Sequence, residues 1–216
     1  MFRGKMKLNF EQQLNKDGNL GPALVMEGED LDEIPSIPNS QSHRLIGINA
    51  SQNKISELPA QLKDFKKLEF LTLTNNLFSA LPPFIGQLSS LRILNLSNNQ
   101  LSSLPEEMED LDQLQELFLD NNKFDVVPSA LFKMPWLKEL YMQHNNLEEI
   151  PAAMSKMTGL KVLIMDYNKI TAVPPEVGMM DLDELYVQHN KVETVPDEVK
   201  IKKFKLLDNP VDPSGL

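Results

Sequence analysis

Residues 137–151 read LKELYMQHNNLEEIP, and residues 182–196 read LDELYVQHNKVETVP. Both stretches follow the form LxELYxQHN and end on proline, so each places a histidine directly before an asparagine. Two explanations compete for this near-repetition. Either His144 and His189 belong to a pair of metal or catalytic sites, or one structural unit has been copied along the chain.

The asparagine of these stretches recurs at an almost constant interval. Apolar residues accompany it at positions −8, −5, −3 and +2, so the unit reads LxxLxLxxNxLxxLP, and a weaker ninth copy near Leu24 has Glu29 in place of the asparagine. A register kept over so many copies indicates an internal repeat, which favours the second explanation. With spacings of 23, 23, 23, 23, 23, 22 and 19 residues, the repeated positions are Asn53, Asn76, Asn99, Asn122, Asn145, Asn168, Asn190 and Asn209.

This pattern resembles that of leucine-rich-repeat proteins, and the 23-residue length with Leu-Pro after the strand resembles the intracellular Ras-group subfamily. The resemblance implies an α/β fold: a curved, horseshoe-shaped solenoid with a parallel β-sheet on its concave face and short helical or 3₁₀ turns on its convex face. We divide the chain into an N-terminal cap (1–19), a solenoid of about nine repeats (20–213) and a C-terminal tail (214–216).

The repeat also predicts this shape from its residues. Alternation in LxLxx gives each unit a short strand whose leucines point into the core. Apolar pairs at about +9 and +12, such as Met108 and Leu111, are spaced for a 3₁₀ turn that begins after the preceding proline. The asparagine amide can bond to the turns of neighbouring repeats, so we expect Asn122 to use neighbours on both sides and Asn209 to have only one.

Both ends of the array require covers. Met6, Phe10 and Leu14 share one face of a helix, so we expect a helical N-terminal cap. The last unit ends at Asn209-Pro210 with little of its own to cover the core, and we expect a partner or a short turn there.

Composition narrows the function. The net charge of −10 argues against nucleic acid as a partner, and no apolar run is long enough for membrane insertion. The chain has no cysteine and its start lacks the apolar run of a secretion signal, which favours a cytoplasmic (intracellular) protein. Early basic residues leave a mitochondrial address as the alternative. No phosphate-loop, dinucleotide or H-E-x-x-H motif is present, so we expect no enzyme activity, cofactor or metal.

Residues that point out of the concave sheet are free to vary, and one group of them suggests a binding surface. At position −4, four successive strands carry Phe118, Tyr141, Ile164 and Tyr186. Large aromatic side chains are typical of interface hot spots, although high strand propensity is an alternative explanation. Bordering these four we place Glu116, Glu139, Glu184, Asp120, Asp166, His144 and His189.

We therefore predict a scaffold or adaptor that binds a partner protein on its concave face, with signalling as its context. The partner would present an apolar ridge flanked by basic residues. The resemblance implies small GTPases or phosphatase subunits as partners in some members. The alternative is a structural subunit of a larger multiprotein assembly.

Overall fold

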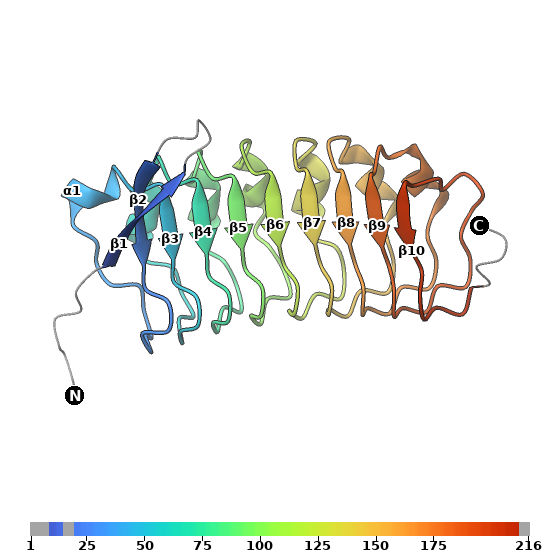
Figure 1. The fold of residues 1–216 in the computed structure, drawn as a ribbon, viewed down its shortest axis with the longest axis horizontal. Coiled ribbons are helices and arrows are strands. Elements are labelled where there is room, and N and C mark those ends of the chain that lie inside the picture. Colours follow the sequence, from blue (N-terminus) through green and yellow to red (C-terminus); the bar gives the residue numbers. More distant parts are fainter. Residues whose placement is uncertain (1–8, 15–19, 212–216) are drawn as a thin grey trace.

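The computed structural model describes residues 9–14 and 20–211. Its strands form one sheet in chain order, β1 to β10 (Figure 1). Strands β2 to β10 run parallel, whereas β1 pairs antiparallel with β2. The strands are β1 (Asn9–Leu14), β2 (Leu20–Val25), β3 (Gly47–Asn49), β4 (Phe70–Thr72), β5 (Ile93–Asn95), β6 (Glu116–Phe118), β7 (Glu139–Tyr141), β8 (Val162–Ile164), β9 (Glu184–Tyr186) and β10 (Lys203–Lys205).

Helical turns lie on the other side of the array. Each 3₁₀ turn follows a proline that serves as its N-cap residue, as the sequence predicted. The predicted leucine-rich-repeat solenoid, with parallel strands on one side and 3₁₀ turns on the other, is confirmed. The helical segments are α1 (Asn39–Ser42), η1 (Ala60–Asp64), η2 (Pro83–Gln87), η3 (Glu106–Asp110), η4 (Ser129–Lys133), η5 (Ala152–Lys156) and η6 (Pro175–Met179).

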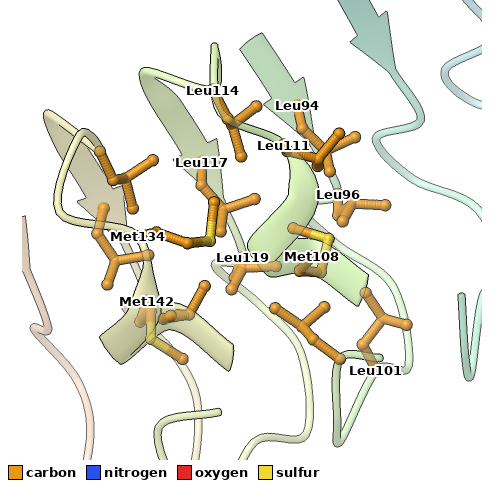
Figure 2. Close-up of a cluster of buried hydrophobic side chains, with 14 of the residues drawn as sticks. Leu94, Leu96, Leu101, Met108, Leu111, Leu114, Leu117, Leu119, Met134 and Met142 are labelled. Carbon is orange, nitrogen blue, oxygen red and sulfur yellow. The ribbon is translucent and has the colours of Figure 1, made fainter. Parts of the chain in front are cut away.

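The core lies between the sheet and the 3₁₀ turns. In the repeat of β6, Leu117 and Leu119 point from the sheet towards Met108 and Leu111 of the convex side, and all four are fully buried (Figure 2). Burying a side chain of this size stabilises the fold by roughly 1.5–3 kcal/mol. Because every repeat buries the same positions against its neighbours, one apolar core runs along the whole array.

The repeated asparagines form a hydrogen-bonded ladder with a direction. The Asn122 amide donates to the carbonyl oxygens of Leu96, Leu119 and Asp120 at 3.0–3.2 Å, and its Oδ1 accepts from the Leu101 backbone N–H at 2.9 Å. All these partners lie in its own or the preceding repeat. Our expectation of neighbours on both sides is therefore wrong.

The last asparagine has the same set of bonds as the others. Asn209 donates to Val187, Leu206 and Leu207 and accepts from the Val192 N–H, so none of its hydrogen bonds depends on a following repeat. It differs from Asn122 in burial, because Asn122 is buried and Asn209 is only partly so.

The residue before each ladder asparagine has a left-handed backbone, which the repeat pattern alone did not lead us to predict. Its φ is between 53° and 57° from Gln52 to Asp208, and 70° at Gly28 in the first unit. Asparagine, aspartate and histidine tolerate this conformation better than most residues. The frequent asparagine at this position was the signal in the sequence. It also explains why histidine recurs there in the two opening stretches.

The ends differ from our expectations. Residues 9–14 are a strand that pairs with β2, so the predicted helix is wrong there, while Met6 and residues 15–19 lie outside the described residues. Pairing with β2 covers the first edge of the parallel sheet. At the other end β10 pairs only with β9 among the described strands, and Leu207 is 63% exposed. The predicted tail, 214–216, also lies outside the described residues.

Candidate protein-interaction surface

The four residues at position −4 lie side by side on the outward face of the sheet. The strand pairing places Phe118, Tyr141, Ile164 and Tyr186 in register on β6 to β9. The rings of Phe118 and Tyr141 stack with centroids 4.5 Å apart and planes within 6° of parallel. Three of the four are partly exposed, but Ile164 is only 9% exposed. Our expectation of four accessible side chains is wrong for Ile164, which stands between two larger tyrosines.

The two tyrosines are tied to glutamates on their own strands. The Tyr141 hydroxyl donates to Glu139 Oε2 at 2.6 Å, and the Tyr186 hydroxyl donates to Glu184 Oε2 at 2.9 Å. Partial burial and then the bond to Glu139 raise the pKa of the Tyr141 hydroxyl far above its usual range. Tyr141 is therefore a fixed hydrogen-bond donor that turns the Glu139 carboxylate towards the ring.

Two of the glutamates face each other. Glu116 and Glu139 are paired in register on adjacent strands. Partial burial, followed by repulsion from Glu139, raises the pKa of the Glu116 carboxyl, while Arg92 opposes the shift. The two like charges are thus held next to the aromatic stack, at a cost to the free protein.

Glu184 has a different environment. Lys203 Nζ lies 2.5 Å from Glu184 Oε1, and Lys205 Nζ lies 4.2 Å from the centre of the Tyr186 ring. The bonds from Lys203 and then Tyr186 hold the pKa of the Glu184 carboxyl below its usual value. Strand β10 of the same chain therefore neutralises this carboxylate.

The two aspartates that we placed at the border make intrachain bonds. Asp120 accepts from the hydroxyl of Ser97 and from Asn121 Nδ2. Asp166 accepts from the backbone N–H of Gln188 at 2.6 Å. Both aspartates thus link neighbouring parts of the array, and they are less available to a partner than Glu116 and Glu139 are.

His144 and His189 lie at the edge of the sheet and are joined by a residue that our sequence analysis missed. Tyr167 stacks between them, with ring centroids 4.3 Å from His144 and 4.1 Å from His189. His189 Nδ1 also lies 2.9 Å from Asp208 Oδ2. The described residues contain no group of three or more metal-ligating side chains. The three rings form an aromatic stack at position −1, the residue with a left-handed backbone directly before each ladder asparagine. Tyr167 occupies this position in the repeat between those of His144 and His189, so the sequence already contained the signal.

The apolar surface extends further than position −4 indicated. Phe70 on β4 and Ile93 on β5 point outwards at position −6 and are partly exposed. On β6 this column changes to Glu116, and the apolar side chain moves to position −4 with Phe118. An apolar track therefore crosses the sheet from β4 to β9 and changes column between β5 and β6. A comparison of the residues at position −6 of every repeat would have revealed this track in the sequence.

Comparisons with known proteins agree with this architecture. Residues 83–203 match the model of the leucine-rich repeat region. A leucine-rich repeat protein of Leptospira interrogans has a similar structure, with a TM-score of 0.78 and 32% identity over 83% of this chain and 48% of that one. The plant peptide hormone receptor RGFR1, in complex with RGF2, is similar in fold, with a TM-score of 0.68 and 22% identity over 92% of this chain and 36% of the receptor. No curated protein matches the sequence.

The chain belongs to the leucine-rich repeat family. It spans about half the length of the first of these solved relatives, and less of the second. Its fold supports a protein-interaction domain. Among the described residues, none forms a helix that is long and apolar enough to cross a membrane.

Proposed function

We propose that the chain is an interaction scaffold or adaptor that acts by binding rather than by catalysis. A partner protein contacts the outward face of β6 to β9. The observation that carries this proposal is the Phe118–Tyr141 stack, which is partly exposed beside the paired carboxylates of Glu116 and Glu139. Nothing in the solenoid core requires these side chains, whereas large aromatic anchors are typical of interface centres. The receptor of similar fold was solved in complex with RGF2, which supports peptide or protein binding by such arrays.

Site-specific photo-crosslinking tests the proposal in native extract. The photoreactive residue p-benzoylphenylalanine replaces Phe118 on the sheet or, as the control, Met179 on the convex side, where it is 80% exposed. We expect one protein to crosslink through position 118 and not through position 179. The proposal fails if the crosslinks come equally from both positions, or only from the convex side.

Apolar side chains at the last described strand favour a second candidate function, that of a fixed subunit in a larger assembly. Phe204 of β10 and Leu206 just after it are partly buried, and Leu207 is exposed, so these apolar side chains are available for contact. Size-exclusion chromatography of native extract separates the two functions. A fixed subunit elutes only with a large complex, whereas an adaptor is also present as the free chain.

A further inference from the structure

The strands of the concave sheet carry the sequence Glu-Leu-Tyr twice. It forms β7, Glu139–Tyr141, and β9, Glu184–Tyr186. In both copies the tyrosine hydroxyl donates to the glutamate two residues earlier. The two units therefore present the same acceptor, a carboxylate held beside an aromatic ring.

The unit on β9 shows what this acceptor binds. The next strand, β10, pairs Lys203 with Glu184 and Lys205 with Tyr186. One ammonium group lies 2.5 Å from the carboxylate oxygen, and the other lies over the ring. Within this chain, a Glu-Leu-Tyr unit thus binds two cationic side chains.

Among the described residues, no cationic side chain occupies the unit on β7. Strand β8 places Val162 and Ile164 beside it, at the positions where β10 supplies lysines to β9. On its other side stands a second carboxylate, Glu116. In the described part of the chain neither Glu116 nor Glu139 forms an ion pair, and the nearby Arg92 is engaged by Glu69 and Gln115.

The physical consequence is a pair of carboxylates, without an ion-pair partner among the described residues, beside the apolar track. Repulsion between Glu116 and Glu139 contributes to the raised pKa of Glu116. A cation placed between them would remove that repulsion, and the stacked rings of Phe118 and Tyr141 would shield it from solvent. A guanidinium group fits better than an ammonium group, because its planar fork can donate to both carboxylates at once.

We propose that Glu116 and Glu139 form a subsite for an arginine side chain of the partner protein, presented by an extended segment that also carries apolar residues. This inference rests on the proposed function of the concave face and specifies the chemistry of its partner. Adjacent strands are about 4.8 Å apart and an extended segment advances about 3.3 Å per residue. Apolar residues about two and four positions from the arginine therefore reach Ile93 and Phe70.

Nuclear magnetic resonance of the full chain tests the subsite directly. The side-chain carboxyl carbons of glutamate are observed while N-acetyl-arginine amide is added, with the uncharged N-acetyl-citrulline amide as the matched probe. We expect saturable shifts at Glu116 and Glu139 with arginine only, and no shift at Glu184, which Lys203 already occupies. Equal shifts at Glu184 or at the exposed Glu148, or none at Glu116 and Glu139, would overturn the subsite.

The unit on β9, whose glutamate is already paired with Lys203, provides a second test in the same experiment. In the double variant Lys203→Met, Lys205→Met, the unit on β9 loses its occupants, so Glu184 should begin to respond to arginine. If Glu184 remains silent while the variant stays folded by circular dichroism, the equivalence of the two units is wrong and the inference loses its basis.

Peptide selection separates this inference from the proposed function. A display library of random twelve-residue peptides is selected on the full chain, and each peptide is then measured on Tyr141→Ala and on the double variant Glu116→Gln, Glu139→Gln. We expect peptides that depend on Tyr141 to contain arginine and to bind the double variant at least about tenfold more weakly. Peptides that need Tyr141 but bind the double variant normally would contradict the arginine subsite and leave the proposed function of the concave face intact. If no peptide depends on Tyr141, the concave site itself fails.

Discussion

The two halves of the concave sheet have the same backbone but different outward side chains. On β3 to β5, position −4 is occupied by Asn49, Thr72 and Asn95. The two asparagines bond within the array: Asn49 Oδ1 accepts from the Ser51 N–H at 3.0 Å, and Asn95 Oδ1 accepts from Thr74 Oγ1 at 2.8 Å and from the Ser97 N–H at 3.0 Å. On β6 to β9 the same position carries aromatic and aliphatic side chains. The core and the asparagine ladder are the same in both halves, so folding does not account for the difference, and the outward residues report how the surface is used.

The prediction with the largest expected effect tests whether the asparagine ladder stabilises the two halves equally. Replacing a buried ladder asparagine by alanine leaves one backbone N–H without its acceptor and removes one hydrogen bond from each of three carbonyl oxygens, which keep a second donor. We expect Asn76→Ala in the first half and Asn122→Ala in the second to lower the free energy of unfolding by about 3 kcal/mol each, because unmade buried hydrogen bonds are costly. Denaturant titration measures both.

Asn209→Ala serves as the comparison at the end of the array. It removes the same kinds of bond from a partly exposed site, where water can replace them, so its loss should be smaller by about 1 kcal/mol or more. A large difference between Asn76→Ala and Asn122→Ala would instead show that the two halves are not structurally equivalent.

The second prediction concerns the outward faces. Tyr141→Ala should weaken binding of the partner found by crosslinking by about 2 kcal/mol, a roughly thirtyfold loss, if the stack is a hot spot. The unfolding free energy should fall by only about 1 kcal/mol, since the side chain lies outside the core but loses its stack on Phe118. Thr72→Ala at the same position of the polar half is the matched control, and calorimetry measures both affinities. Similar losses for the two variants would remove the distinction between the halves.

Reversal of one charge should act mainly on the rate of association. In Glu139→Lys the new ammonium group stands beside Glu116 and repels a basic partner. We expect association at low salt to slow about tenfold and its salt dependence to flatten, with stability unchanged or slightly higher. Stopped-flow measurements over a range of salt concentrations test this, and a partner whose association becomes faster would be acidic, contrary to our proposal.

The sequence was sufficient to predict the solenoid because the residues that produce this fold recur periodically. Ladder asparagines, inward leucines and prolines before the 3₁₀ turns recur at fixed positions, and the structure has the strands and turns where this pattern predicted them. The N-terminal residues were not periodic in this way. Phe10 and Leu14 are four apart, which suits a helix, but pairing with the exposed edge of β2 gives a strand instead. The unpaired edge of a sheet is a tertiary requirement that local spacing does not contain.

The candidate surface was predicted in part. The column of Phe118 and Tyr141 followed from the register alone, because residues at one position of a repeat stack on adjacent strands. Two features depended on side-chain geometry that a column of letters does not show. One is that Lys203 neutralises Glu184 whereas no described residue forms an ion pair with Glu139, and the other is that Tyr167 joins the two histidines into one stack.

The smallest expected effect compares the two kinds of glutamate through pH. Partial burial and Glu139 raise the pKa of Glu116 above the ordinary 4.5, so folding favours its protonated form. The stability that this group contributes is present below pH 4.5 and is lost as the pH rises through its raised pKa. The opposite holds for Glu184, whose pKa Lys203 and Tyr186 lower: its contribution is present above pH 4.5 and is lost as the pH falls through the lowered value.

Substitution by glutamine, which does not titrate, should therefore have opposite signs at the two positions. At neutral pH we expect Glu116→Gln to raise the midpoint of urea unfolding and Glu184→Gln to lower it. The gain at Glu116 should be less than about 1 kcal/mol, because the site is partly exposed and solvent screens the repulsion. Both differences should shrink in acid, that of Glu116→Gln first, since its carboxyl protonates at higher pH. If Glu116→Gln destabilises the chain at neutral pH, then a cation of the chain already balances Glu116 in solution, and the contrast between the empty unit on β7 and the filled unit on β9 disappears.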